Sequence, residues 1–180
     1  MNYPFRLGQK IYLRALDEGD IEHCLRWFND PLITKHLESG RVPLDRKSQI
    51  EHMEDSRKNP SEIVMAICKD DNDLHIGNVG FHNISVIDRT AEIGVVIGER
   101  TLHHKGFGSE AIRAMCEYGF TTLNLNRVYL KVKRSNDNAI ECYKKCGFVE
   151  EGVQRQHSFE NGEYVDLVFM GLLKEEWEAQ

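Results

Sequence analysis

The spacing of apolar residues divides the chain into strand-like and helix-like segments. Around Ile11 and Leu13, apolar and polar positions alternate, as in a strand that buries one face. Ile21, Leu25 and Phe28 instead recur at i, i+4 and i+7, which is the spacing of one helix face. The same patterns predict strands at 9–15, 62–68, 75–83, 92–97, 127–133, 149–159 and 164–173, and helices at 17–28, 44–57, 108–122 and 136–146.

Turn and cap residues agree with these boundaries. Asp17 is a candidate N-cap of the first helix, and Asn29-Asp30-Pro31 should end that helix. Asn136 stands at the N-cap of the last helix and Gly147 at its C′ position, while Asn161-Gly162 is the preferred two-residue hairpin turn. These elements predict one α/β (α+β) domain over residues 1–180, with a mixed, mostly antiparallel sheet of about seven strands and about four flanking helices.

Composition places the chain among ordinary globular proteins. Of its 180 residues, 41% are hydrophobic and 29% are charged. No segment approaches the roughly 18 apolar residues of a membrane helix, and the N-terminal MNYPFRLGQK lacks the apolar core of a signal peptide. We therefore expect a cytoplasmic protein with no membrane partner. The net charge of -6 argues against nucleic acid as a partner and mildly favours a cationic one.

The cysteines indicate neither a metal site nor a disulfide framework. Cys24, Cys68, Cys116, Cys142 and Cys146 form an odd set without a Cys-x-x-Cys pair, which is typical of buried free thiols. The histidines also lack a regular ligand spacing. The sequence therefore predicts no metal.

Two segments carry the chemical information. The first, AEIGVVIGERTLHHKGFGSEA from Ala91 to Ala111, has the pattern of an apolar strand, a bend, a Lys-Gly-Phe-Gly turn and a helix start. Glycines allow backbone amides to approach a ligand and a helix N-terminus attracts anions, so this turn favours phosphate binding. It lacks the Gly-Lys-Ser/Thr of a P-loop and the third glycine of a dinucleotide fingerprint. The second segment, SNDNAIECYKKCGF, runs from Ser135 to Phe148.

Together these segments resemble the core of the GNAT superfamily of N-acetyltransferases. The family loop is Arg/Gln-x-x-Gly-x-Gly/Ala, and its later motif is Asn-x-x-Ala-x-x-x-Tyr-x-x-x-Gly-Phe. The predicted order of elements is also that of the GNAT fold, so the resemblance covers nearly the whole chain, although its specific motifs lie between Ala91 and Phe148. The first half is similar to the Rim-type branch (ribosomal-protein and spermidine acetyltransferases) through LRAL, a tryptophan-bearing helix and Asn-Asp-Pro.

The resemblance implies a site for acetyl-coenzyme A (acetyl-CoA). Its pyrophosphate would contact the amides of the glycine loop, and its pantetheine arm would pair with the strand at 92–97. The residues that this places at the cofactor are Val95, Val96, Ile97, His103, His104, Lys105, Gly106, Phe107, Gly108, Ser109, Asn136 and Ala139. The first loop position is His103 rather than the family's Arg or Gln, which weakens a side-chain role there.

The resemblance also implies two catalytic residues. Tyr143 would protonate the departing thiolate, and Glu92 would take a proton from the acceptor amine, directly or through water. Strand alternation leaves a second interpretation of Glu92 as a surface residue, in which case the base would be water, His82 or the substrate itself. Cys142 points about 100° away from Tyr143 around the helix, so direct transfer is expected rather than an acetyl-cysteine intermediate.

These implications predict an acetyl-CoA-dependent N-acetyltransferase for a primary amine, as a monomer or homodimer. The sequence does not distinguish between two kinds of acceptor, a small-molecule amine (polyamine, amino sugar or aminoglycoside) and a peptide or protein N-terminus. We expect it to bind near the segment from Arg26 to Asp45, with His36, Glu38 and Asp45 as candidate contacts, and near the last hairpin. The alternative is a catalytically silent acyl-CoA sensor or interaction module of the same fold. A cofactor-free structural protein would require the glycine loop to be a coincidence.

Overall fold

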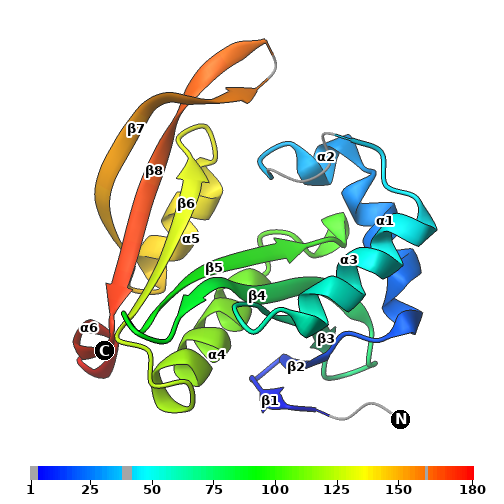
Figure 1. The fold of residues 1–180 in the computed structure, drawn as a ribbon, viewed down its shortest axis with the longest axis horizontal. Coiled ribbons are helices and arrows are strands. Elements are labelled where there is room, and N and C mark those ends of the chain that lie inside the picture. The colour runs from blue at the N-terminus through cyan, green and yellow to red at the C-terminus, as the bar shows by residue number, and fades with distance from the viewer. Residues whose placement is uncertain (1–3, 38–41, 161) are drawn as a thin grey trace.

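The computed structural model describes residues 4–37, 42–160 and 162–180, and the strands in these ranges form one eight-stranded sheet. The strand order is β1-β2-β3-β4-β5-β6-β8-β7 (Figure 1). Neighbouring strands are antiparallel except for β5 and β6, which are parallel, so the predicted mixed, mostly antiparallel sheet is confirmed. The strands are β1 (Arg6–Leu7), β2 (Ile11–Ala15), β3 (Ile63–Lys69), β4 (His75–Ser85), β5 (Thr90–Ile97), β6 (Arg127–Lys133), β7 (Val149–Glu160) and β8 (Glu163–Leu173).

Six α-helices accompany the sheet in the described ranges. They are α1 (Ile21–Phe28), α2 (Pro31–Thr34), α3 (Arg46–Lys58), α4 (Phe107–Thr121), α5 (Asp137–Lys145) and α6 (Lys174–Glu178). The four longer helices are those that the sequence predicts. The short elements β1, α2 and α6 were missed, because two to five residues are too few to show a periodicity. Asp17 caps a 3₁₀ turn, Glu18–Asp20, which leads into α1.

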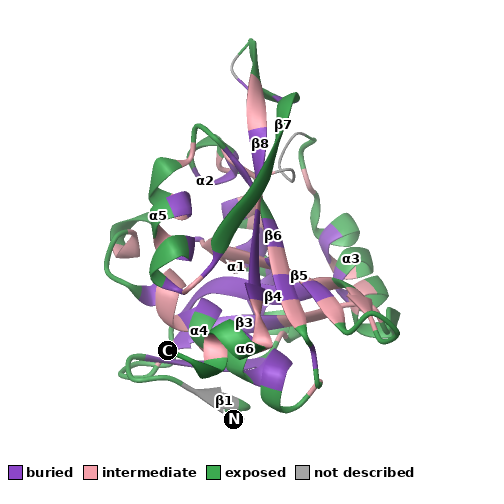
Figure 2. Cartoon of the chain, turned by 90° about the vertical axis from the view of Figure 1, so that its left-hand side faces the viewer, coloured by how far each residue is buried: buried purple, intermediate pink, exposed green. Residues whose placement is uncertain are grey.

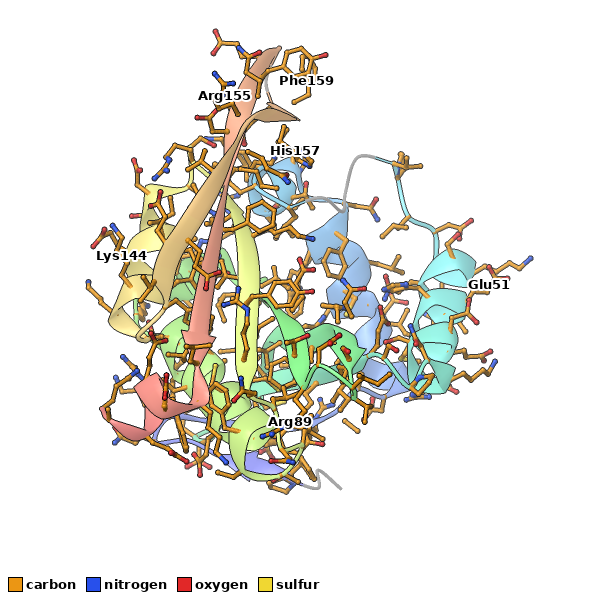
Figure 3. All side chains as sticks on the ribbon, turned by 60° about the vertical axis from the view of Figure 1, so that its left-hand side comes forward. Glu51, Arg89, Lys144, Arg155, His157 and Phe159 are labelled. Carbon is orange, nitrogen blue, oxygen red and sulfur yellow. The ribbon has the colours of Figure 1, made fainter. Side chains whose placement is uncertain are left out.

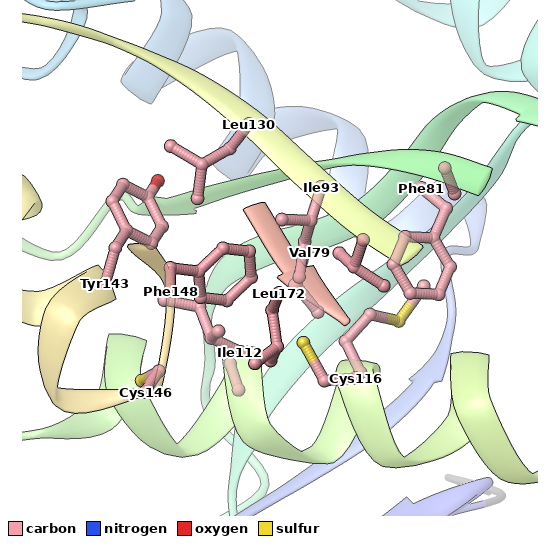
Figure 4. Close-up of a cluster of buried hydrophobic side chains, with 14 of the residues drawn as sticks. Val79, Phe81, Ile93, Ile112, Cys116, Leu130, Tyr143, Cys146, Phe148 and Leu172 are labelled. Carbon is pink, nitrogen blue, oxygen red and sulfur yellow. The ribbon is translucent and has the colours of Figure 1, made fainter. Parts of the chain in front are cut away.

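The sheet has a helical layer on each face. α4 packs along one face over the main core, and Figure 4 shows Ile112 and Cys116 of this helix beside Val79 and Ile93 of the sheet. α1 and α3 cover the opposite face (Figure 1). Because strand residues alternate between faces, the neighbours of Ile93 along β5 point towards the α1–α3 side.

A buried ion pair fixes the start of α1 to the sheet. Arg14 of β2 donates two hydrogen bonds to Asp20, at 2.7 and 2.8 Å, and His75 Nδ1 lies 3.0 Å from the same carboxylate. Burial alone would raise the pKa of Asp20, but the hydrogen bonds from Arg14 and His75 outweigh it and hold the pKa well below the usual range. The carboxylate therefore stays ionised and keeps the α1 layer in place.

The ends of α5 are those that the sequence predicts. The Asn136 side chain caps its first turn. Gly147 follows the helix with φ +91°, and its N–H donates to Lys144 O at 3.0 Å, while Phe148 N–H donates to Tyr143 O at 3.1 Å. These two bonds form a Schellman motif, which closes the helix one turn after Tyr143.

β7 and β8 form a long hairpin that projects from the body of the sheet (Figures 1 and 2). Most of β7 is exposed, and Ser158 and Glu160 are its buried residues. Glu160 lies 3.0 Å from His36 Nδ1 and 3.6 Å from Lys133 Nζ, so the hairpin tip approaches the end of α2. Gly162 has φ +89°, as the predicted turn requires, and Asn161 lies outside the described residues.

Gly77→Ala should destabilise the protein, because a Cβ on this β4 residue would overlap the Val96 carbonyl oxygen of β5. We expect a loss of about 1–3 kcal/mol in the free energy of unfolding, measured in urea. Gly152→Ala on β7 is the matched control, since no atom lies within 4 Å of a Cβ there, and its effect should stay within about 0.5 kcal/mol. Equal midpoints for the two variants would contradict tight pairing of β4 with β5.

Candidate active site

β5 and β6 separate partway along β5. Their parallel pairing ends at Glu92 and Tyr129, and from Ile93 to Ile97 the described structure pairs β5 with β4 alone. Figure 1 shows the two strands diverging beyond this point. The β6-facing backbone groups of this half of β5 are therefore available to pair with an extended ligand, as a peptide pairs with a sheet edge.

A cavity of about 740 Å³ lies at this opening and connects the two faces of the sheet. Ile112 of α4 and Tyr143 of α5 line it on one face, and Met53 of α3 and His82 of β4 line it on the other. Its volume is within the range of small-molecule sites. The predicted site residues that line it are Glu92, Val95, Val96, Asn136, Ala139 and Tyr143.

The glycine loop lies beyond the end of β5 and does not line this cavity. Gly106 is the N-cap of α4 and has φ +89°. A Cβ at Gly106 would contact nothing within 4 Å, so the backbone conformation, and not space, requires glycine there. The His103 ring Nε2 lies 2.8 Å from Ile97 O and thereby joins the loop to the end of β5. His103, which stands where the family has Arg or Gln, thus has a structural role.

The remaining loop residues divide between ligand-accessible and structural positions. Lys105 is exposed, as is His104, which has φ +61°. The Phe107 side chain is 8% exposed and belongs to the core, so only its backbone can face a ligand. Ser109 Oγ lies 3.1 Å from Cys142 Sγ and links α4 to α5. The first amides of α4 lack acceptors within the helix, which suits the pyrophosphate of acetyl-CoA.

Tyr143 is a buried phenol at the cavity wall. Its side chain is 8% exposed, and its ring meets Phe148 edge-on with centroids 5.8 Å apart. Figure 4 shows its hydroxyl on the side of Leu130. Burial, reinforced by the neighbouring Cys142 and Cys146 thiols, raises the pKa of Tyr143 well above its ordinary value. The hydroxyl therefore stays protonated at neutral pH and can donate a proton.

A row of polar side chains crosses the α1–α3 face of the sheet where β5 and β6 separate. His82 of β4 pairs with Glu92 of β5, and Glu92 pairs with Tyr129 of β6. Glu62, which directly precedes β3, occupies the next cross-strand position beside His82. His82 Nδ1 lies 3.3 Å from Glu62 Oε1. Glu62, His82 and Glu92 all line the cavity.

The Glu92 carboxylate lies in the cavity and is already hydrogen-bonded. Its side chain is 19% exposed, and its Oε2 accepts from Lys131 Nζ at 3.0 Å and from Asn83 Nδ2 at 3.0 Å. Neither partner is among the residues that the sequence motifs indicate. The alternation of β6 gives a signal for Lys131, since it shares a face with Tyr129, whereas Asn83 depends on a β-bulge that nothing in the sequence reveals.

The residues expected at the acceptor side have different positions. His36 lines the cavity and contacts Glu160 of the hairpin. Asp45 is instead the N-cap of α3, where its carboxylate accepts from Ser48 N–H at 2.7 Å. Asp45 therefore does not line the cavity, because helix capping uses this side chain. Glu38 lies outside the described residues.

Three further observations concern metals, thiols and membranes. All five cysteines are free thiols, as the sequence predicts. Within the described ranges, no three His, Cys, Asp or Glu side chains gather in a way that could hold a metal ion. In the same ranges, no helix combines the length and apolar character needed to cross a membrane.

Comparison with known proteins identifies the family. Residues 10–149 match the model of the acetyltransferase (GNAT) domain. The uncharacterized N-acetyltransferase p20 of Bacillus licheniformis is 31% identical over 173 residues, which cover 94% of this chain and 96% of that protein. The spermidine N(1)-acetyltransferase of Vibrio cholerae is 29% identical over 171 residues, covering 95% and 97%. A crystal structure of the Vibrio cholerae spermidine N-acetyltransferase with CoA and spermine has a TM-score of 0.87 at 29% identity, covering 94% of this chain and 98% of that one.

This chain belongs to the GNAT acetyltransferase family. Like its relatives it is an N-acetyltransferase, an acyltransferase with acetyl-CoA as the donor. The family accounts for the opening between β5 and β6 and for the glycine loop at the start of α4.

Proposed function

We propose that the protein transfers an acetyl group from acetyl-CoA to a primary amine by direct attack inside the cavity. The observation that carries this proposal is the cavity itself, because it joins Tyr143 on one face of the sheet with Glu62, His82 and Glu92 on the other. A thioester held in the opening would have its sulfur on the side of Tyr143. The amine would reach its carbonyl carbon from the polar side.

The donor is proposed to bind along a path from the glycine loop to Tyr143. The amides of residues 103–109 hold the pyrophosphate, and the free backbone groups of residues 95–97 pair with the pantetheine arm. Asn136 and Ala139 line the other side of the arm. Support for this path comes from the contact of His103 with Ile97 O, which joins the loop to the open half of β5.

Tyr143 is proposed as the general acid that protonates the departing thiolate. Support comes from its burial at the cavity wall, which keeps the phenol protonated. Glu92 is the proton acceptor that the sequence analysis puts forward, and His82 is the alternative. Both side chains lie in the polar row, on the side from which the amine would enter.

The acceptor is proposed to be a primary amine, with four chemical classes to compare. Relatives of this chain acetylate spermidine, which carries several ammonium groups. Each carboxylate of the described cavity wall already contacts a basic side chain: Asp20 contacts Arg14, Glu62 contacts His82, and Glu92 contacts Lys131. The described wall therefore offers no cluster of unpaired carboxylates that would favour a polyamine over the other amines.

A four-class amine panel tests this function. The protein is incubated with acetyl-CoA and either spermidine, a peptide with a free N-terminal serine, glucosamine or kanamycin, and free thiol is followed. We expect thiol release with at least one class, together with the acetylated amine in the mass spectrum. Binding of acetyl-CoA without acetylation of any of these amines would contradict the proposal and indicate a silent acyl-CoA-binding module.

A further inference from the structure

His82 has its two ring nitrogens directed at different partners. Nδ1 lies 3.3 Å from the Glu62 carboxylate, and the Nε2 edge lies over Gly94, where an added Cβ would be 3.5 Å from Nε2. Gly94 is two residues past the last β5–β6 pair, so Nε2 faces the start of the opening. The side chain is 41% exposed and lines the cavity, which leaves Nε2 accessible to a bound amine.

A β-bulge in β4 directly follows His82. The register with β5 shifts between His82 and Ser85, and Asn83 has φ +51°, a left-handed conformation that is uncommon for a residue other than glycine. Bulges re-aim side chains and are frequent next to active sites. This bulge brings the Asn83 amide to Glu92, on the face that His82 shares. The bulge therefore adds a hydrogen-bond donor to the polar row beside His82.

Glu62 is an anion that selects the tautomer of the ring. Burial alone would raise the pKa of Glu62, but hydrogen bonds from Ser56 and His82 outweigh it and lower the pKa. A carboxylate beside Nδ1 holds the proton on that nitrogen in the neutral imidazole, and the Nε2 lone pair then points away from it. An oriented histidine with a carboxylate behind it is the arrangement of a general base.

Glu92 is less suited to the same task. Its Oε2 accepts from both Lys131 and Asn83, and a carboxylate oxygen has about two acceptor sites, so this oxygen is fully used and only Oε1 is left to take a proton. In His82, the contact with Glu62 uses Nδ1, so it leaves Nε2 able to accept a proton. The two side chains are cross-strand partners, and the ring of His82 lies over Gly94 at the start of the opening.

We propose that His82 takes the proton from the acceptor ammonium and that Glu62 positions the ring for it; this rests on the proposed acetyl transfer. The N–H bond of the ammonium breaks, and its proton joins Nε2. The freed lone pair attacks the thioester carbonyl carbon, and the C–S bond breaks as the amide forms. Tyr143 gives its proton to the thiolate and recovers one from the amide nitrogen through solvent. His82 releases its proton to solvent.

Charged groups face His82 from every element packed around it. Glu62 stands beside it at the start of β3, and Glu92 lies opposite on β5 with Lys131 of β6 bound to it. His52 and Arg57 of α3 line the same cavity. The pH profile of the wild-type kcat/KM therefore reflects this whole cluster of charged groups. Assigning the proton transfer to His82 requires a variant that lacks the His82 imidazole.

His82→Gln tests the proposal through the pH dependence of kcat/KM, with the best acceptor of the panel. Without the base, only amine molecules that are already neutral react. About one in 2,500 is neutral at pH 7 for an amine with a pKa near 10.4, and about one in ten for a peptide N-terminus. At pH 7 we expect a loss of about 10²–10³-fold for an amine with a pKa near 10.4 and of about tenfold for a peptide N-terminus, and either loss shrinks as the pH approaches the pKa of the amine. The affinity for acetyl-CoA, measured by calorimetry, should not change.

Glu62→Gln separates positioning from folding. This variant should lower kcat with little change in the KM for acetyl-CoA, and Glu62→Asp should recover part of the loss. Glu51→Gln, at an exposed position of α3 that does not line the cavity (Figure 3), is the matched control and should retain the wild-type profile. A merely structural role of Glu62 would instead lower the unfolding midpoint in proportion to the loss of activity, which would overturn its assignment.

Three further outcomes contradict different claims. If the wild type acetylates an amine and His82→Gln retains the wild-type profile, the assignment of His82 is overturned. A Glu92→Gln variant that alone loses activity at pH 7 and recovers it at high pH would move the base to Glu92. If the wild type releases no thiol with any amine, the proposed function itself fails.

Discussion

Tyr143→Phe should lower kcat by about 10²–10⁴-fold, the usual contribution of a general acid. The phenylalanine ring keeps the contact with Phe148, so only the proton donor is lost. Because burial keeps the Tyr143 hydroxyl protonated, the loss should be similar across the neutral pH range. Steady-state kinetics give kcat, and calorimetry should show unchanged affinity for acetyl-CoA.

The control for this prediction is Tyr118→Phe in α4, at a position that does not line the cavity. It removes the same hydroxyl from an equally buried ring that also packs edge-on against a phenylalanine, Phe5, and its kcat should equal that of the wild type. The comparison requires conditions in which the chemical step limits the rate. Turnover of Tyr143→Phe at the wild-type rate would then reduce Tyr143 to a packing residue.

Replacing Gly106 and Gly108 with valine should abolish the binding of acetyl-CoA. A β-branched residue at φ +89° is strained, so the loop would leave the conformation that presents its amides. A side chain at Gly108, whose Cβ would lie 3.8 Å from Ile97, would project where the loop meets the end of β5. We expect micromolar affinity in the wild type and a loss of at least about 100-fold in the variant, measured by calorimetry.

Gly162→Val is the matched control for Gly106. Both glycines have φ +89°, and a Cβ at either position would contact nothing within 4 Å. The two substitutions therefore introduce the same backbone strain, one in the loop and one in the distant hairpin turn. Only the loop variant should lose acetyl-CoA. Unchanged cofactor binding in the variant at positions 106 and 108 would remove the phosphate role of the loop.

Much of the fold could be predicted because its signals are local. The alternation of apolar residues predicted the observed bounds of β6, and Asn136 and Gly147 predicted the two ends of α5. These signals act within one or two turns of chain, where capping bonds and side-chain spacing do not depend on distant segments. Elements of two to five residues carry too little of this signal, which is why α2 and α6 were missed.

The candidate site was predicted only as a set of residues. The motifs name Tyr143, the glycine loop and Glu92, and the structure places the first and last at one cavity, with the loop at the end of β5. The ion pair of Glu92 with Lys131 joins positions 39 residues apart in the chain. A sequence pattern cannot report such a contact, because it depends on the register between strands.

The sequence by itself determined the family, the element order, the caps and the glycine at position 106. Each of these depends on backbone conformation or on a motif within a short segment. Only the tertiary structure decided that β5 and β6 separate after Glu92, that a cavity joins both faces of the sheet there, and that His82 meets Glu62 in its wall. The physical reason is that cross-strand register, which sets which side chains meet, is fixed by the packing of the whole sheet and not by neighbouring residues.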